Sequence, residues 1–257
     1  MPGRLFVYHL PHHTGSGAEQ MAIDRALLDW AASDGSRAVF RTYAWSRPTL
    51  SLGRTEPYPK GWNPVSIQAA GIDVVRRPTG GDAVLHDGEL TFAVAASLPG
   101  PWGLRPRAFA DLVAEALADA LRGLSLPAER IDAAADREAP SRPGERPCFA
   151  RPSPGEVRVG HYKVAGIASR FTRGAALSHA SVPLSPRHRD VASFRADAGA
   201  DRAELDRNAR ATTELLGRAL PAFVLGSRVA SAISARLRAP LRPSDFADLG
   251  IVEPELV

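Results

Sequence analysis

Short β-type segments separated by only a few helices constrain the fold of this 257-residue chain most strongly. Alternation of apolar and polar residues over 90–98 predicts a strand that is buried on one face. Runs of similar character, bounded by Gly, Pro, Asn or Ser, predict further strands at 5–9, 38–45, 49–53, 72–77, 156–159, 162–169 and 175–184. Residues 156–169 are expected to form a hairpin that turns at Gly160 and His161.

The helices are few and unevenly placed. Ser16 and Glu19 have the spacing of a capping box, and Gly123 follows an apolar pattern with helical period. Helices are expected at 16–30, 109–121, 201–219 and 221–239. Together these segments predict an α+β fold, with a mixed or mostly antiparallel sheet flanked by helices.

Composition narrows the class of function. The formal net charge is +4, from 30 Arg and 2 Lys against 28 acidic residues, which suits acidic partner proteins. We see no zinc-ligand spacing and no basic-aromatic signature, so neither a metal nor nucleic acid is expected. No apolar run approaches the roughly 18 residues of a membrane span. With no secretion signal recognised, a cytoplasmic protein without membrane contact is expected.

Three features outside the core pattern point to chemistry. The stretch RRPTGGDAVLHDGEL (76–90) is either a binding loop, whose glycines admit a ligand, or a plain turn with surface arginines. Lys163 lies in an apolar strand, where it either reaches a substrate oxygen as a point charge or points to solvent. Cys148 is the only cysteine, so it is either a nucleophile or an incidental thiol, and a disulfide within the chain is excluded.

Residues 127–155 carry six prolines and show no periodicity. A segment of this length inside a compact domain is typical of a functional lid or a disordered insert. We expect it to close over the substrate and exclude water. Cys148 stands near its end.

Four separated stretches resemble the lipoate–protein ligase and octanoyltransferase family. They are EQMAIDRALL with WSRPTLSLG, then RRPTGGDAVLHDGELT, KVAGIASR and LSHASV, in the order and at the spacing of that family. The resemblance covers roughly residues 5–190. It implies the biotin/lipoyl-ligase fold, which has a class II synthetase-like core. A catalytic domain over 1–190 is expected, with a helical extension over 191–257 packed on the same domain.

The resemblance also implies the site residues. Cys148, followed by Phe149 and an acidic Glu156, resembles the nucleophile of the cysteine-dependent octanoyltransferases, and Lys163 resembles the lysine that contacts the acyl carbonyl. A nearby Lys163 ammonium is expected to lower the pKa of the Cys148 thiol. The implied substrate-binding residues are Arg76, Arg77, Thr79, Gly80, Gly81, His86, Gly166, Ala168 and His179.

The chain departs from the family pattern at four places. Asp82 replaces a usual glycine or arginine, Ile167 and Ser169 stand in a Gly-Ser-Ala-Gln motif, and Ala180 stands in a His-Gly-Ser motif. A carboxylate at Asp82 would disfavour a phosphate nearby. The Asn-Asp pair typical of ATP-using ligases is also missing.

These features predict octanoyl transfer from acyl carrier protein to a lysine of a lipoyl domain or of the glycine-cleavage H protein, through a Cys148 thioester and without a cofactor. Lys163 and backbone donors of the Thr79–Gly81 loop are expected to stabilise the oxyanion. Three alternatives remain: an ATP- and Mg²⁺-dependent lipoate–protein ligase, a lipoyl-domain amidotransferase, and a non-catalytic protein that binds acyl groups.

Overall fold

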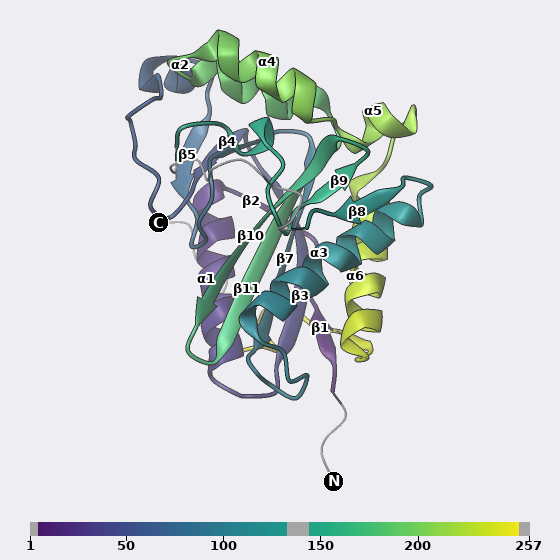
Figure 1. Ribbon diagram of the computed structural model, residues 1–257. Helices are drawn as coiled ribbons and strands as arrows, with labels where there is room; N and C mark the ends of the chain where they lie inside the picture. Colours follow the sequence, from purple (N-terminus) through teal and green to yellow (C-terminus); the bar gives the residue numbers. More distant parts are fainter. Residues whose placement is uncertain (1–4, 133–143, 252–257) are drawn as a thin grey trace.

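A mixed sheet forms the centre of the protein (Figure 1). The computed structural model describes residues 5–132 and 144–251, and within them this sheet has nine strands. β1 (Val7–His9) pairs in parallel with β12 (Leu241–Pro243) and β3 (Ala38–Trp45), β2 (His13–Gly15) pairs in parallel with β3, and the other neighbours are antiparallel. Across the sheet the strands are β12 (Leu241–Pro243), β1 (Val7–His9), β3 (Ala38–Trp45), β7 (Glu89–Ser97), β11 (Ala175–Pro183), β10 (Tyr162–Thr172), β9 (Val157–Val159) and β8 (Ala128–Arg130), with β2 (His13–Gly15) beside β3. The expected α+β fold with a mixed, mainly antiparallel sheet is confirmed.

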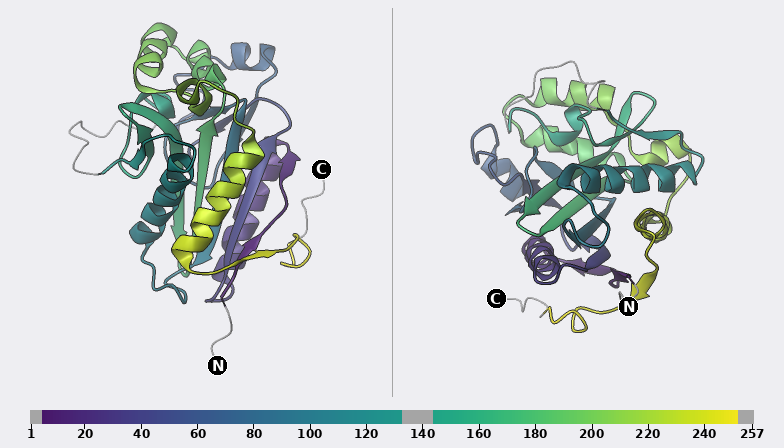
Figure 2. Two further views of the ribbon diagram at one scale, coloured as in Figure 1. Left: turned by 90° about the vertical axis from the view of Figure 1, so that its right-hand side faces the viewer. Right: turned by 60° about the horizontal axis from the view of Figure 1, so that its bottom comes forward.

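Helices cover both faces of this sheet, as the turned views in Figure 2 show. α1 (Gly17–Ala32) packs on one face, and α3 (Pro106–Arg122) and α6 (Ala222–Leu237) pack against each other on the opposite face. Ser16 and Glu19 form the expected capping box at the start of α1, and Gly123 follows the end of α3. The helices are α1 (Gly17–Ala32), α2 (Pro64–Ala69), α3 (Pro106–Arg122), α4 (Ala198–Asn208), α5 (Thr212–Leu216) and α6 (Ala222–Leu237), with 3-10 helices at Cys148–Ala150 and Pro186–Phe194.

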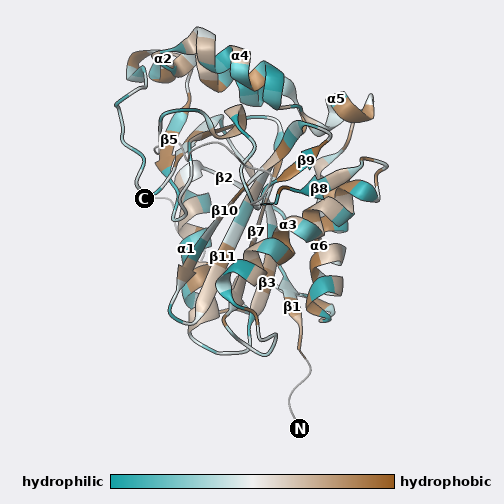
Figure 3. Ribbon diagram, in the orientation of Figure 1, coloured by the Kyte–Doolittle hydropathy of each residue, from teal (hydrophilic) through white to brown (hydrophobic). Residues whose placement is uncertain are grey.

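The expectation that residues 90–98 are buried on one face only is wrong. Leu90, Phe92 and Val94 pack into the core beneath α3 and α6, whereas Ala93 and Ala95 pack beneath α1. Both faces of β7 are covered, and the alternation is one of large against small apolar side chains. Figure 3 shows the result: pale and brown residues along β7 and β11, with teal residues more frequent on α4.

A smaller three-stranded sheet lies beside the main one within the described residues. Its central strand β4 (Thr49–Leu52) pairs in parallel with β5 (Asp73–Arg76) and antiparallel with β6 (Val84–His86). The segment between β5 and β6 is the Arg-Gly-Gly loop of the sequence motif. Leu50, Leu52 and Phe149 contribute to a third apolar cluster, which joins this sheet to the Cys148 segment.

A single helix over 201–219 was expected, and this expectation is wrong. The chain leaves α4 at Asn208 because Ala209 bridges to Lys163, whose carbonyl accepts the N–H of Arg210 at 3.2 Å. It re-enters a helix, α5, at Thr212, whose hydroxyl donates to the Pro183 carbonyl at 3.0 Å. Tertiary hydrogen bonds to the central strands therefore override helix propensity at residues 209–211.

The proline-rich segment 127–155 contains regular structure at both ends, namely β8 and the 3-10 helix Cys148–Ala150. Its centre, 133–143, lies outside the described residues, so the predicted lid stays a prediction. None of the helices in the described part of the chain is long and apolar enough to span a membrane.

Phe92 offers a direct test of the core between the sheet and α3 and α6. Its side chain is 0% exposed, whereas that of Phe223 on α6 is 75% exposed. We expect Phe92→Ala to lower the free energy of unfolding by about 3–5 kcal/mol, because the cavity cannot be filled. Phe223→Ala should change it by no more than about 0.5 kcal/mol. Urea unfolding measures both, and equal effects would contradict this core.

Candidate active site

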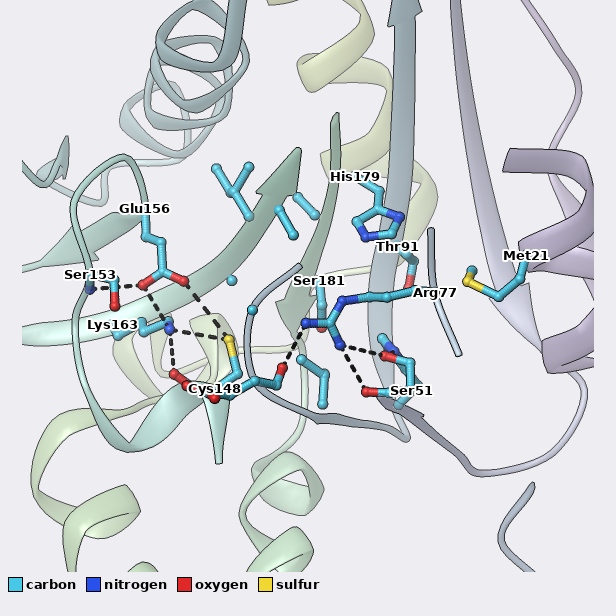
Figure 4. A pocket seen from close by; sticks show the side chains of 18 of the residues that line it. Met21, Ser51, Arg77, Thr91, Cys148, Ser153, Glu156, Lys163, His179 and Ser181 are labelled. Atoms are coloured by element: carbon cyan, nitrogen blue, oxygen red, sulfur yellow. Dashed lines mark hydrogen bonds and ion pairs between the residues drawn. The ribbon is translucent and has the colours of Figure 1, made fainter. Parts of the chain in front are cut away.

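A pocket of about 180 Å³ lies between the central strands, the small sheet and the Cys148 segment. β10 and β11 contribute one wall through Gly166 and His179, and β6 contributes His86. Figure 4 shows Cys148 at one end of the pocket with Lys163 and Glu156, and Met21 at the other end, with Arg77 between. A concave, largely apolar space with a few convergent polar groups is typical of a small-molecule site.

The Cys148 segment is held from several sides. The Cys148 N–H donates to the Ala83 carbonyl at 3.1 Å, and Asn208 on α4 donates to the Ala150 carbonyl at 2.7 Å. Phe149 is buried in the third apolar cluster. Cys148 itself is half-buried and lines the pocket, so the alternative of an incidental thiol in a loose loop does not describe its surroundings.

Lys163 is 0% exposed, which excludes the alternative of a solvent-facing side chain. Its ammonium lies 2.7 Å from Glu156 Oε2, donates to the carbonyls of Cys148 at 2.5 Å and Arg151 at 3.2 Å, and lies 3.4 Å from Cys148 Sγ. The Cys148 thiol in turn donates to Glu156 Oε1 at 3.9 Å. Cys148, Lys163 and Glu156 therefore form one contiguous triad at the end of the pocket.

The electrostatics of this triad differ from the sequence-based expectation. Burial raises the pKa of the Cys148 thiol, and although Lys163 acts to lower it, the net pKa lies above the ordinary value. Burial acts to lower the pKa of Lys163, but Cys148 and Glu156 outweigh it and raise that pKa. Burial also raises the pKa of Glu156, against the opposing charge of Lys163. Lys163 does act to lower the thiol pKa, as expected, but desolvation and the Glu156 charge exceed the attraction of the ammonium, so the net pKa is raised.

Arg77 stabilises the Arg-Gly-Gly loop through hydrogen bonds to backbone carbonyls. Its buried guanidinium donates to the carbonyls of Ser51 at 2.8 Å, Gly80 at 2.7 Å and Asp82 at 2.8 Å. It still lines the pocket, as does Gly81, whose φ of +85° suits only glycine without strain. The loop also touches Gly53 so closely that a Cβ there would lie 1.9 Å from the Gly81 oxygen.

Three predicted binding residues do not line the pocket. Arg76 is exposed, and its guanidinium donates to the carbonyls of Gly53 at 2.7 Å and Glu56 at 2.8 Å. Gly80 accepts from Arg77 through its carbonyl and is not among the residues that line the cavity. Thr79 is buried behind the wall, where its hydroxyl meets His179 Nε2 at 2.6 Å. These residues shape the loop, and their predicted contact with substrate has no support in this geometry.

His179 lines the pocket and is oriented by a buried carboxylate that sequence reasoning missed. Asp24 on α1 accepts from His179 Nδ1 at 3.0 Å and from Arg41 at 2.5 Å. Burial acts to raise the pKa of Asp24, but Arg41 and His179 outweigh it and lower that pKa. Burial lowers the pKa of His179, so the neutral ring donates from Nδ1 and accepts the Thr79 hydroxyl at Nε2.

A second missed carboxylate, Glu89, lies behind His86. His86 Nδ1 is 2.6 Å from Glu89 Oε1, its Nε2 is 2.7 Å from Ser51 Oγ, and its ring stacks on Trp45 with centroids 4.0 Å apart. Hydroxyls of Thr91 and Ser181 also donate to Glu89. Burial acts to raise the pKa of Glu89, but His86 and these hydroxyls outweigh it and lower that pKa. His86 thus lines the pocket with both ring nitrogens engaged.

The departures from the family pattern lie mostly on the pocket wall. Ile167 and Ala180 are cross-strand partners in β10 and β11, and both line the pocket, as do Gly166, Ala168 and Asp82. A Cβ on Gly166 would lie 3.2 Å from Cys148 Sγ, so this glycine leaves room for the sulfur. Ser169 pairs with Ser178 across the strands at 2.6 Å, away from the cavity. Among the described residues, no cluster of three His, Cys, Asp or Glu could hold a metal ion.

The raised pKa of Cys148 predicts its reactivity. Iodoacetamide reacts with the thiolate, so alkylation of the folded protein should be slow at neutral pH and should rise with pH beyond the range where an ordinary thiol saturates. The same cysteine in urea serves as the control. Faster alkylation at neutral pH in the folded state than in urea would contradict the raised pKa.

The contact between Gly53 and Gly81 predicts a second outcome. Gly53→Ala should lower the free energy of unfolding by about 1–3 kcal/mol, because the loop must move off the new methyl group. Gly80→Ala is the matched control, since a Cβ there meets no atom within 4 Å, and it should cost no more than about 0.5 kcal/mol. Urea unfolding distinguishes them, and equal costs would argue against the close contact.

Known proteins share both the sequence and the fold. Residues 16–220 match the family model of the lipoyl protein ligase A/B catalytic domain. A protein of Exiguobacterium sp. named octanoyltransferase LipM is 37% identical over 175 residues, which are 66% of this chain and 63% of that relative. Another of that name, from Carboxydothermus hydrogenoformans, is 33% identical over 177 residues, 68% of this chain and 64% of the relative. The match thus spans less than two thirds of each relative's length.

Two solved structures share the fold. Lipoate-protein ligase A bound with ATP superposes with a TM-score of 0.74 at 20% identity, covering 95% of this chain and 90% of that one. The bi-partite lipoate protein ligase of Thermoplasma acidophilum gives 0.75 at 18% identity, covering 99% of this chain and 100% of that one. The fold is therefore that of lipoate–protein ligases. Because the family match extends over most of the sequence, this chain belongs to the lipoyl protein ligase A/B catalytic-domain family.

Proposed function

We propose that this protein is an octanoyltransferase of lipoate biosynthesis. It takes an octanoyl group from acyl carrier protein onto Cys148 and passes it to a lysine of a lipoyl domain or of the glycine-cleavage H protein. The observation that carries this proposal is the sulfur of Cys148 lining the pocket, 3.4 Å from the Lys163 ammonium. Relatives named octanoyltransferase LipM support the class of reaction.

In this proposal the acyl chain lies along the pocket, with its carbonyl at Cys148 and its tail directed toward Met21, the two side chains that Figure 4 shows at opposite ends. Val84, Ile167 and Ala168 give this path apolar walls. A cavity on the order of 150 Å³ already holds a molecule the size of benzene. The cavity of about 180 Å³ is therefore of the right order for a short acyl chain, before any opening of the pocket.

Transfer proceeds by one thioester exchange followed by aminolysis of the enzyme thioester. The Cys148 sulfur attacks the carrier thioester, a tetrahedral intermediate collapses, and the carrier thiol leaves. The neutral ε-amine of the acceptor lysine then attacks the enzyme thioester and releases Cys148 as the amide forms. A thioester is exchanged for a thioester and then for a more stable amide, so the reaction needs neither ATP nor a metal.

The oxyanion of each tetrahedral intermediate forms beside Lys163. The buried ammonium is positioned before reaction by Glu156 and two carbonyls, so little reorganisation is needed. Of the loop residues expected to donate backbone N–H groups, only Gly81 lines the pocket, and it is the one we retain. Removing one oxyanion donor typically costs about 3 kcal/mol of transition-state stabilisation.

The net charge of the chain is complementary to that of acidic carrier proteins. A protein with a formal net charge of +4 favours encounter with acidic carrier domains in the cytoplasm. A lipoyl-domain amidotransferase would use the same residues with a lipoyl domain as donor. An ATP-driven ligase would place a phosphate near Asp82, whose carboxylate lines the pocket and works against a second anion.

Replacement of Cys148 by Ser separates these reactions. With octanoyl carrier protein and no ATP, the wild-type protein should gain one octanoyl group on Cys148, sensitive to hydroxylamine, and modify a lipoyl domain. Cys148→Ser should lose transfer by several orders of magnitude, because serine is a much weaker nucleophile at neutral pH. Intact-mass analysis measures both steps.

The substrates of the same assay provide the controls. Transfer by Cys148→Ser that requires ATP and free octanoate would replace our proposal with a ligase. A wild-type adduct formed only from an octanoylated lipoyl domain would make the protein an amidotransferase.

A further inference from the structure

The proposed transfer requires an acceptor for the Cys148 proton, and Lys163 does not fill that role. An ammonium has three hydrogens, and Lys163 already has four acceptors around it: Glu156, the carbonyls of Cys148 and Arg151, and the Cys148 sulfur. A nitrogen that faces four acceptors is a donor to them, so Lys163 is an ammonium and has no lone pair for a further proton. It can stabilise a thiolate but cannot take up the proton that the thiol must lose.

Glu156 is the acceptor within reach of that proton. The Cys148 thiol donates to Glu156 Oε1 at 3.9 Å, a distance within hydrogen-bond range for sulfur. Asp82, on the loop after β5, also faces this end of the pocket, as does Arg77. Asp82 Oδ1, however, accepts from the Gly144 N–H at 2.9 Å, and in the described residues no hydrogen bond joins it to the sulfur.

We propose that Glu156 is a catalytic residue, the general base that accepts the Cys148 proton as the sulfur attacks the acyl thioester. This inference deepens the proposed octanoyl transfer and rests on it. Glu156 acts directly on a reacting atom through Oε1, while Oε2 holds the Lys163 ammonium in position. One carboxylate therefore links the proton transfer to the charge that stabilises the resulting thiolate.

The proton returns in each half of the reaction. In the first half, the S–H bond breaks, an O–H bond forms on Glu156, and the sulfur bonds to the carbonyl carbon. Collapse breaks the bond from that carbon to the carrier sulfur, which receives the proton from Glu156. In the second half, Glu156 takes a proton from the attacking ε-amine and returns it to the Cys148 thiolate as the C–S bond breaks. Thiol and carboxylate are both restored.

The surroundings of Glu156 suit this role. The side chain is buried at the start of β9, and backbone N–H groups of Ser153 and Ile167 hydrogen-bond its carboxylate and fix its orientation. Burial raises its pKa toward the range where a carboxylate is a better base. The thiol pKa is raised as well, which keeps Cys148 protonated until substrate arrives.

The pH profile separates a general base from a residue that only positions Lys163, because the positioning role gives the wild-type rate no acid-side midpoint at the carboxylate. A role limited to the charge of Glu156 on the thiol predicts the opposite sign of the rate change. In that case Glu156→Gln would only remove a negative charge that raises the pKa of Cys148. The thiolate fraction would then increase, and Cys148 would be acylated as fast as in the wild type or faster. A general base predicts slower acylation from the same variant.

The test is single-turnover acylation of Cys148 by octanoyl carrier protein, followed by rapid quench and intact mass across a range of pH. At neutral pH, Glu156→Gln should react about 10²–10⁴-fold more slowly than the wild type. The wild-type rate should fall on the acid side as Glu156 becomes protonated. The acylation rate of Glu156→Gln should show no midpoint from a titrating carboxylate. It should instead rise steadily with pH as the Cys148 thiol ionises.

Two further variants sharpen the test. Asp82→Asn removes a different carboxylate that also raises the pKa of Cys148 and has no bond to the sulfur, so its acylation rate should rise. Glu156→Asp keeps a carboxylate, so it should retain the acid-side fall and recover part of the rate. It also keeps the inference testable if thermal unfolding shows that Glu156→Gln is not folded.

The possible results distinguish a failure of the role of Glu156 from a failure of the proposed octanoyl transfer. Equal or faster acylation in folded Glu156→Gln, or loss of the acid-side fall in Glu156→Asp, would overturn the role of Glu156 and leave octanoyl transfer standing. Absence of any Cys148 adduct in the wild-type protein would overturn the proposed function and this inference with it.

Discussion

The buried ammonium of Lys163 is the interaction on which the rest of the site depends. Moving a charge out of water costs several kcal/mol unless partners compensate, so a fully buried lysine requires a dedicated set of acceptors around it. This set consists of Glu156, which directly precedes β9, the carbonyls of Cys148 and Arg151, and the Cys148 sulfur. Because these groups come from separate segments, satisfying one cation brings the nucleophile to the end of the pocket.

Buried charged groups with partners inside the protein also lie behind other walls of the pocket. Asp24 with Arg41, and Glu89 with His86, are buried polar groups paired inside the protein rather than exposed to water. Each pair orients a side chain that faces the cavity, His179 in the first case and His86 in the second. Charged networks that are satisfied internally make rigid walls, so the pocket can offer an apolar path without collapsing around it.

Much of the architecture could be predicted from local patterns. The Ser16–Glu19 capping box, the Gly123 stop and the strands of the motif regions follow from short-range chemistry and are confirmed. Strands β2, β6, β8 and β12 were missed, because segments this short depend on pairing with distant partners rather than on their own pattern. The break at residues 209–211 was missed for the same reason.

The site was predictable where residue identity alone indicated chemistry. Cys148 and Lys163 were recognised because each is rare in this chain, and the structure brings them together. Asp24 and Glu89 were not, because among 28 acidic residues the local sequence gives little to distinguish a buried carboxylate from a solvated one. A polar residue within an otherwise apolar helical stripe, as at Asp24 in QMAIDRALL, was the available signal. The net pKa of Cys148 depends on desolvation, which only the packed structure reveals.

β12 pairs with β1 and covers an edge of the main sheet that would otherwise be exposed. The family match ends at residue 220, yet α6 covers Phe40 and Phe92, and Leu241–Pro243 close the side of β1 that faces away from β3. A polypeptide ended at the family boundary would leave a bare strand edge next to uncovered aromatic side chains, a combination that favours self-association. During synthesis the edge of β1 therefore stays unpaired until β12 has been made and can pair with it.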